Sequence, residues 1–228
     1  MRNYLTEFIG TFFLVLTIGL TVLDGTPFAP LAIGASLMIM VYMGGHVSGA
    51  HYNPAVSLAV LLRGKMASTG EFAGYVISQI AGATAAALVT YLIVGRTFAP
   101  APAAGASAVA PLLVEFLYTF ALGLVVLNSA ASAKTHGNSF YGLAIGFTIV
   151  VGAFAGGPLS GGAFNPAVGI GPILVNALLG GGTWAHLWLY LVGPLAGGAL
   201  AAVVFGLQER EPIQLHAEPS RVPESRPA

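Results

Sequence analysis

The chain has 228 residues, of which 56% are hydrophobic and only 7% are charged, and its formal net charge is zero. Because soluble domains carry roughly 25% charged residues, this composition excludes an ordinary solvated surface and predicts an integral membrane protein. The neutral balance gives no electrostatic basis for a nucleic-acid partner, and the lack of cysteine excludes disulfides, thiolate metal sites and thiol catalysis.

Six apolar runs are long enough to cross a hydrocarbon core of about 30 Å. They lie near residues 4–23, 28–47, 70–95, 111–131, 139–157 and 184–207. A loop rich in Pro and Ala at 96–110 separates the third run from the fourth. The polar, Pro-rich residues 208–228 predict a disordered cytoplasmic tail. The expected fold class is therefore an all-α membrane protein with six transmembrane helices.

The basic residues are distributed unevenly between the two sides of the predicted membrane domain. If the N-terminus is cytoplasmic, Arg96 is the one basic residue of eight on the outer side. The other seven are Arg2, Arg63, Lys65, Lys134, Arg210, Arg221 and Arg226. By the positive-inside bias, we expect both termini in the cytoplasm, and the short loops suit a bacterial inner membrane.

The two halves of the chain repeat each other. Residues 31–56, LAIGASLMIMVYMGGHVSGAHYNPAV, match residues 143–168, LAIGFTIVVGAFAGGPLSGGAFNPAV, without a gap and with 12 of 26 positions identical. The match extends outward, since EFIGTF from Glu7 corresponds to EFLYTF from Glu115. The two copies span 1–97 and 110–207. Each copy holds three spans, so the second crosses the membrane in the opposite sense, and such inverted repeats usually enclose a substrate pathway.

Each copy contains an Asn-Pro-Ala motif inside an apolar stretch. The motifs are Asn53, Pro54 and Ala55, and Asn165, Pro166 and Ala167. Asn is a preferred N-cap and Pro is favoured at the first helical position, so each motif predicts a helix start. A helix from Asn53 to Arg63 would be about 16 Å long, roughly half the hydrocarbon core. We therefore expect two re-entrant half-helices that enter from opposite sides and meet at the centre, with the two asparagines adjacent.

The segments before these motifs, 46–52 and 158–164, are expected to be non-helical. Non-helical backbone at membrane depth has to be buried in protein or face a water-filled cavity, so these segments should line a wet passage. Each half-helix N-terminus brings about half an elementary charge to the centre, which repels cations and protons. The amides of Asn53 and Asn165 would donate hydrogen bonds to a passing neutral molecule.

The paired motifs, each preceded by Ser-Gly, the glutamates in the first and fourth spans and the inverted repeat make the chain resemble the aquaporins, or major intrinsic proteins. The resemblance covers about 1–207, the expected channel domain. It implies a homotetramer in membrane lipid, with one pore in each protomer. The implied function is passive passage of water and small uncharged solutes of the urea, ammonia, hydrogen peroxide or glycerol class.

The resemblance also implies a selectivity filter. Its four positions are Ile33, Ala153, Gly162 and Val168. Most members carry arginine after the second motif, where this chain has Val168, and water-selective members place an aromatic residue and a histidine at the first two positions. All four residues here are apolar and two are very small, so we expect a wider and less polar constriction. In this respect the chain is similar to plant tonoplast channels with valine at the arginine position.

Glu7 and Glu115 lie within predicted spans, where ionisable groups are functional candidates by default. One interpretation makes them proton or cation sites. The favoured interpretation, which the resemblance also implies, is support of the pore wall: each carboxylate accepts hydrogen bonds from the backbone that precedes a half-helix. His46 and His51 flank the first motif and could titrate as a gate, but buried, hydrogen-bonded histidines are the simpler expectation.

Two other functions compete with a passive channel. An ion-coupled secondary transporter also uses inverted repeats and broken helices, but it needs a charged coupling site, and neither asparagine has an acidic neighbour in sequence. A structural membrane protein with a closed pore would give no reason for the two asparagines. The sequence has no recognisable pair of nucleophile and base, metal ligand set or phosphate loop, so we expect no enzyme, cofactor or metal site.

Overall fold

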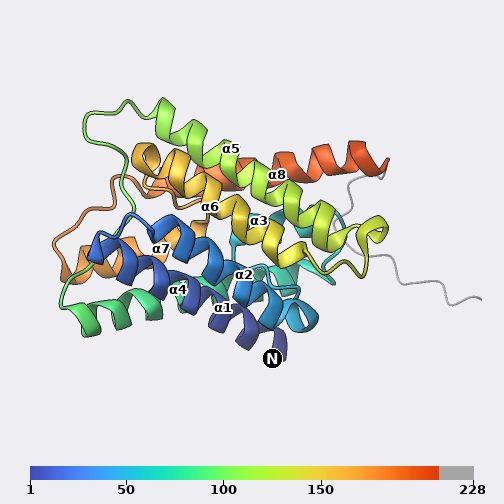
Figure 1. The fold of residues 1–228 in the computed structure, drawn as a ribbon, viewed down its shortest axis with the longest axis horizontal. Coiled ribbons are helices and arrows are strands. Elements are labelled where there is room, and N and C mark those ends of the chain that lie inside the picture. The colour runs from blue at the N-terminus through green and yellow to red at the C-terminus, as the bar shows by residue number, and fades with distance from the viewer. Residues whose placement is uncertain (211–228) are drawn as a thin grey trace, which may run out of the picture.

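The computed structural model describes residues 1–210 as a bundle of helices (Figure 1). Within these residues, six helices are long and apolar enough to cross a membrane. They are α1 (Arg2–Asp24), α2 (Ala29–Ser48), α4 (Thr69–Val94), α5 (Val109–Val126, continued by a π-helix over Leu127–Ala131), α6 (Tyr141–Ser160) and α8 (Leu187–Glu209). A single 3₁₀ turn, Ala133–Thr135, follows the π-helix. The six predicted spans are therefore confirmed.

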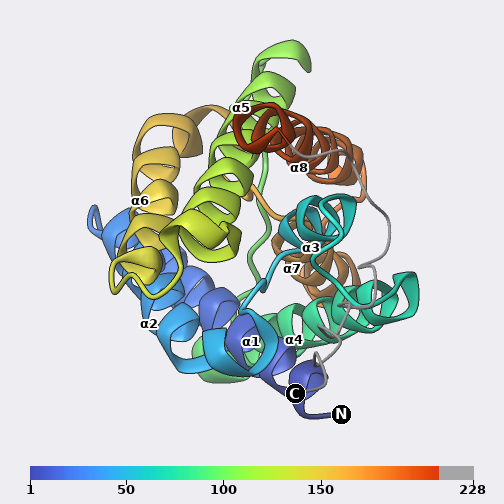
Figure 2. The same cartoon turned by 90° about the vertical axis from the view of Figure 1, so that its right-hand side faces the viewer.

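Two shorter helices, α3 (Pro54–Leu62) and α7 (Pro166–Leu179), begin at the two predicted motifs. Asn53 and Asn165 are their N-caps, and each side-chain oxygen accepts a hydrogen bond from the backbone N–H two residues later, at 2.9 Å. Seen along the bundle, α3 and α7 lie between α4 and α8 (Figure 2). Both expected half-helices are present, and both start for the expected reason.

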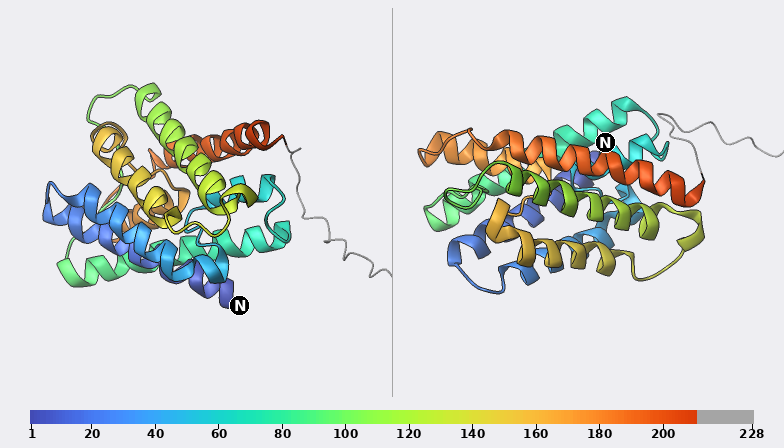
Figure 3. Two further views of the ribbon diagram at one scale, coloured as in Figure 1. Left: turned by 45° about the vertical axis from the view of Figure 1, so that its right-hand side comes forward. Right: turned by 90° about the horizontal axis from the view of Figure 1, so that it is seen from above.

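The helices of the two copies pack in the same pattern. In the first copy α1 packs on α2 and α4, and in the second copy α5 packs on α6 and α8. Each half-helix packs on the last long helix of the other copy, α3 on α8 and α7 on α4. The half-helices lie toward opposite ends of the bundle (Figure 3). This exchange interlocks the copies and gives the inverted three-plus-three arrangement.

Small residues let the paired helices approach closely. A β-carbon at Gly197 of α8 would meet the backbone carbonyl oxygen of Phe116 and, at 2.8 Å, the backbone nitrogen of Phe120 in α5. The same holds for Gly82 of α4, where a β-carbon would meet the carbonyl oxygen of Phe8 in α1. Close backbone approach of this kind is a main source of attraction between helices in lipid, where burial of apolar surface gives little.

The loops before the half-helices are shorter than the sequence predicts. Residues 46–52 and 158–164 were the expected non-helical segments, but the observed loops are 49–53 and 161–165. The prediction is wrong at its N-terminal boundary in both copies. The long helices continue by three residues, to Ser48 and Ser160.

Pro158 does not end α6, because the helix runs through it. A proline inside a membrane helix frees one backbone carbonyl, and neighbouring helices can shield that group from lipid. The two helices end instead at Gly49 and Gly161, whose φ angles are 83° and 91°. Glycine adopts this left-handed backbone without the steric strain that a side chain would cause. The conformation turns the chain into each loop.

The N-terminus and the last turn of α8 lie at one end of the bundle, which we call the N-terminal end (Figure 1). The sequence predicts a tail from residue 208, but Gln208 and Glu209 are helical. Asn128 Nδ2 donates to Gln208 Oε1 at 3.0 Å, and Lys134 Nζ lies 2.8 Å from Glu209 Oε2, so these contacts hold the last turn. The rest of the predicted tail, 211–228, lies outside the described residues.

Candidate functional site

Three cavities adjoin one another along the bundle. The central cavity shares Ile18, Ile33, Gly162 and Val168 with a cavity at the end opposite the N-terminus. It shares His51 with a cavity at the N-terminal end. Each end cavity has a volume of about 980 Å³, part of which is open to solvent, and the central one has a volume of about 470 Å³. The central cavity is therefore the smallest of the three.

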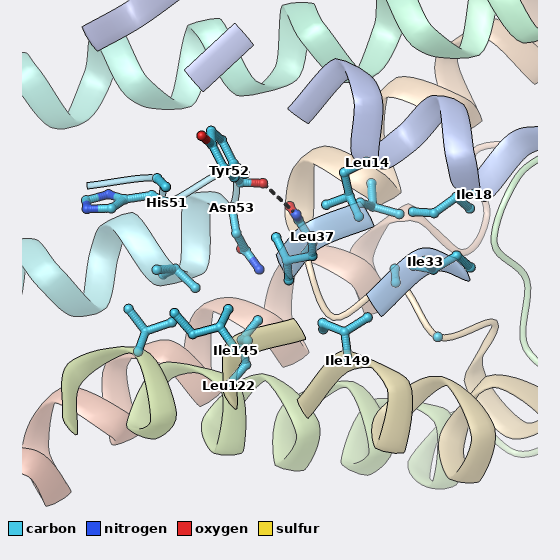
Figure 4. Close-up of a pocket in the computed structure, with 17 residues that line it drawn as sticks. Leu14, Ile18, Ile33, Leu37, His51, Tyr52, Asn53, Leu122, Ile145 and Ile149 are labelled. Carbon is cyan, nitrogen blue, oxygen red and sulfur yellow. Dashed lines mark hydrogen bonds between the residues drawn. The ribbon is translucent and has the colours of Figure 1, made fainter. Parts of the chain in front are cut away.

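The wall of the central cavity is built from equivalent residues of the two copies. Long helices contribute apolar side chains at a spacing of four residues, which sets them on one helix face. The pairs are Leu14 with Leu122, Ile18 with Val126, Ile33 with Ile145, and Leu37 with Ile149. Asn53 faces Leu122 and Ile145 across the cavity (Figure 4). Polar atoms come mainly from the two loops, so a molecule inside meets polar groups on one side and hydrocarbon on the other.

The two asparagines meet at this cavity and cross-link the loops. Asn53 Nδ2 donates to the carbonyl oxygen of Phe164 at 2.9 Å, and Asn165 Nδ2 donates to the carbonyl oxygen of Tyr52 at 2.8 Å. The second of these bonds is drawn in Figure 4. Both side chains are almost fully buried and both line the central cavity. Each amide nitrogen carries two hydrogens, so one remains for a molecule in the cavity.

The residue before each asparagine adopts an uncommon backbone conformation. Tyr52 and Phe164 both have φ of 48°, a left-handed geometry that costs a residue with a side chain about 1–2 kcal/mol. Both side chains are fully buried. This turn aims the two carbonyl oxygens at the opposite asparagines, so surrounding contacts have to offset the cost.

Glu7 supplies those contacts in the first copy. Its carboxylate accepts hydrogen bonds from the backbone nitrogen of His51 at 3.0 Å and of Tyr52 at 2.7 Å. Ser48 Oγ and Gln79 Nε2 also donate to it, at 2.6 and 2.8 Å. The side chain is fully buried. One carboxylate thus ties the end of α2, the loop and α4 together.

Glu115 makes the equivalent contacts in the second copy. It accepts from the backbone nitrogen of Ala163 at 3.0 Å and of Phe164 at 2.6 Å, and from Ser160 Oγ at 2.8 Å. Tyr190 then donates to the carbonyl oxygen of Ser160 at 2.6 Å, as Tyr75 does to that of Ser48 at 2.7 Å. Both carboxylates bond the loop backbone and neither lines the central cavity.

All four filter candidates line the cavity opposite the N-terminus, and Ile33, Gly162 and Val168 line the central cavity as well. Ala153 lines the cavity opposite the N-terminus but not the central cavity. The loop between α4 and α5 adds Phe98, Ala99, Pro100 and Ala101 to the same cavity. The described lining of this mouth carries no charged side chain.

The two histidines that flank the first motif have different surroundings. His46 is exposed on α2, in contrast to the expected buried environment. His51 is 9% exposed, and its Nδ1 lies 3.0 Å from Ser57 Oγ. It borders the N-terminal cavity, whose polar lining also includes Asn3, Lys65 and Glu71.

Sequence reasoning missed the apolar wall of the central cavity. A signal for it exists, because Leu14 and Leu122 both lie seven residues after a buried glutamate, and equivalent residues follow four positions later in each copy. In a chain that is hydrophobic throughout, however, periodicity alone cannot separate a residue that faces a cavity from one that faces lipid.

Comparison with known proteins agrees with this geometry. The family model of the major intrinsic proteins matches residues 1–205. The chain is 39% identical over 216 residues to aquaporin NIP1-4 of Oryza sativa subsp. japonica, covering 91% of this chain and 77% of that protein. It is 36% identical over 216 residues to glycerol uptake facilitator protein-like 6 of Lactiplantibacillus plantarum, covering 89% and 95%. The X-ray structure of the aquaglyceroporin from Plasmodium falciparum matches with a TM-score of 0.80 and 22% identity over 90% of this chain and 94% of that one; it bears on the fold alone.

Proposed function

Because the chain belongs to the major intrinsic protein family and is thus a passive channel for water and small solutes, we propose that its pore is the file of three adjoining cavities. The observation that carries this proposal is the shared lining: the central cavity shares residues with a mouth at either end. The pore then passes Asn53 and Asn165 at its middle and the four filter candidates at its outer mouth.

The filter is proposed to admit small neutral solutes besides water. Ile33, Ala153, Gly162 and Val168 offer neither a charge nor a side-chain hydrogen bond, so they select by size. A mouth of this kind suits urea, ammonia, hydrogen peroxide or glycerol. One relative is named a glycerol uptake facilitator, which supports a polyol among the candidates.

Ion exclusion is proposed to come from the centre of the pore. The N-termini of α3 and α7 meet there, and their unpaired N–H groups and dipoles create a positive potential. The side-chain amide of each asparagine, Asn53 and Asn165, uses one hydrogen to bond the opposite loop and donates the other to an oxygen atom of the solute. A water held by two donors at this point donates outward in both directions and relays no proton.

Glu7 and Glu115 are proposed to support the pore wall and to have no part in transport. Their hydrogen bonds support this role. Each carboxylate accepts two from loop backbone, and side chains donate two more to Glu7 and one more to Glu115. They hold the left-handed turns that aim the carbonyl oxygens of Tyr52 and Phe164 at the asparagines.

The channel is proposed to work as a homotetramer in a bacterial inner membrane with both termini in the cytoplasm. Its described basic residues support the orientation, since Arg2, Arg63, Lys65, Lys134 and Arg210 are at or near the N-terminal end and Arg96 follows α4 at the other. Large apolar side chains such as Phe147 and Leu92 are exposed on the helices, as contact with lipid or with other protomers requires.

A coupled transporter is not favoured. Among residues 1–210, no Asp, Glu, Lys or Arg lines the central cavity, so the middle of the proposed pore has no charged group for a coupling ion. The chemistry available is hydrogen bonding to a neutral solute.

The test is stopped-flow light scattering on proteoliposomes after an osmotic shock with urea, and then with glycerol, against empty liposomes. We expect fast shrinkage followed by protein-dependent re-swelling. Fast shrinkage without re-swelling would reject the wide filter but keep the channel. Uphill solute accumulation driven by an imposed ion gradient would reject the passive mechanism.

A further inference from the structure

The lining of the central cavity repeats itself across the two copies of the chain. The ungapped match between residues 31–56 and 143–168 gives each filter candidate a counterpart in the other copy. Three of the candidates line the central cavity, and we call them the outer ring: Ile33, Gly162 and Val168. Their counterparts line it too, and we call them the inner ring: Ile145, Ala50 and Val56. The fourth candidate, Ala153, and its counterpart Val41 both lie outside this lining.

The two rings lie toward opposite ends of the central cavity. The outer ring also lines the cavity opposite the N-terminus. Ile18 is shared between those two cavities, and its counterpart Val126 is shared between the central and the N-terminal cavity. The inverted repeat thus relates one end of the central cavity to the other. Figure 4 shows Ile33 and Ile145 apart along the cavity, with Leu37 between them, so a molecule that crosses the cavity passes both rings.

The rings are built from nearly the same residue types. Each has an isoleucine from a long helix and a valine that directly follows an Asn-Pro-Ala motif. They differ at one position, where the inner ring has Ala50 and the outer ring has Gly162. A polar solute in either ring loses hydrogen bonds to water that these side chains do not replace. Each ring can therefore hinder a solute in the same way, by size and by loss of water.

Ala50 keeps its methyl group in a backbone conformation that favours glycine. Its φ angle is 53°, and that of Gly162 is 64°. Only glycine adopts this left-handed region without steric strain, so the first copy holds a side chain here at a cost. Strained residues of this kind cluster at functional sites. Because Ala50 lines the central cavity, its methyl group adds to the inner ring what the outer ring lacks.

We propose that the inner ring is a second size filter, in series with the outer ring. Ala50, Ile145 and Val56 then determine specificity together with the filter candidates at the other end. The inference rests on the proposed pore and deepens it, because half of the size selection moves to the inner side of the two asparagines. With two barriers in series, opening one ring leaves the other in control of the rate.

The first experiment opens the rings singly and together. Val56→Ala and Val168→Ala each remove two carbons from one ring, and re-swelling of proteoliposomes after a xylitol shock measures permeability to a five-carbon polyol. Because the two barriers are comparable, each single variant should raise this permeability by at most about twofold. If each substitution makes passage of its own ring about tenfold faster, the double variant gains about tenfold. A tenfold gain from one single variant, with nothing added by the other, would overturn the proposal.

Ala50→Gly opens the inner ring without leaving a hole in the packing. It makes the two rings alike and relieves the left-handed strain, so we expect no loss of thermal stability. Xylitol permeability should rise further when this change is added to Val168→Ala. No rise in that background would overturn the role of the inner ring, and the retained stability excludes a lost fold as the cause.

Narrowing the inner ring gives the converse test. Val56→Leu adds one carbon, and we expect urea flux to fall although the outer ring is untouched, since either barrier alone can limit the rate. Urea flux equal to that of the wild type would contradict the proposal. Val175→Ala is the matched control for the two alanine variants, because Val175 is a buried valine of α7 that lines none of the three cavities. It should change neither urea nor xylitol permeability.

Water permeability of the wild type tests the proposed pore separately. A wild type that conducts no more than empty liposomes would reject the pore and the inner ring together. A conducting wild type in which Val168→Ala alone gives the whole gain would reject the inner ring and keep the pore. Folded yield and melting temperature of each variant separate an opened ring from a damaged fold.

Discussion

Val168 is the residue at which the proposed filter departs most clearly from the arginine that the family resemblance leads us to expect. Its side chain is 3% exposed and borders both the outer and the central cavity. In the proposed pore a residue at this junction contacts every molecule that passes, so its size and charge should set which solutes enter.

We expect Val168→Arg to suppress urea and glycerol flux more strongly than water flux. The long cationic side chain narrows a mouth whose described lining is uncharged. This narrowing should lower the permeability of a larger solute more than that of water. Light scattering after solute and sucrose shocks gives the two permeabilities, and Val168→Leu controls for size without charge. Loss of water flux equal to or greater than the loss of solute flux would contradict the filter assignment.

Glu115 accepts two hydrogen bonds from the backbone of the second loop and one from Ser160 Oγ. In Glu115→Gln an N–H₂ group replaces one of the two accepting oxygens, so the backbone nitrogen of Phe164 or Ala163 loses its partner. An unpaired buried donor costs about 1–3 kcal/mol, and we expect a lower melting temperature and folded yield with little change in ion leak. Thr119→Val is the control, since Thr119 Oγ1 one turn later is buried without a partner in the described chain. A changed proton conductance at unchanged stability would instead give Glu115 a transport role.

At the scale of elements, the half-helices work through their first turns. Pro54 and Pro166 occupy the first helical position of α3 and α7, and an asparagine caps each helix. The same asparagine bonds the opposite loop, so each cap is also a link between the copies. A single residue type thus starts the helix and joins the halves.

Asn165→Asp separates these two roles. A carboxylate oxygen still accepts from the nitrogen of Ala167, which preserves the cap, but it cannot donate to the carbonyl oxygen of Tyr52. It also brings negative charge to a centre that is proposed to repel cations. We expect modest destabilisation and a measurable cation or proton conductance in planar bilayers, whereas Asn165→Ala should lose more stability and gain less conductance. Identical conductance in the aspartate variant and the wild type would contradict exclusion at the centre.

At the scale of the whole molecule, the proposed membrane orientation rests on the placement of basic residues. The chain has no cysteine. A single introduced cysteine therefore reports the membrane topology without background labelling of native cysteines. We expect Ala104→Cys, in the exposed loop between α4 and α5, to react with a membrane-impermeant maleimide on intact cells. Ala133→Cys, exposed near the N-terminal end, should react only after lysis. The reverse pattern would invert the proposed orientation.

The helices and their starts were predictable because they depend on local chemistry. Apolar runs that are long enough to span the membrane predict the long helices. Asn53 and Asn165 each precede a proline and are N-caps, so they predict the starts of the half-helices. The loop boundaries were less predictable, since Pro158 is a local signal that the surrounding bundle overrides. The choice of Gly161 over Pro158 as the end of α6 depends on contacts between helices that the local sequence does not encode.

The sequence by itself determined the membrane location, the inverted repeat, the two half-helices and the meeting of the two asparagines, because these follow from composition, periodicity and capping. Only the tertiary structure decided which apolar residues face the passage, since Leu14 and Phe13 are equally hydrophobic but only Leu14 lines the central cavity. It alone also linked Glu7, Gln79, Ser57 and His51, residues up to 72 positions apart, because a hydrogen-bond chain between separate helices exists only once those helices have packed.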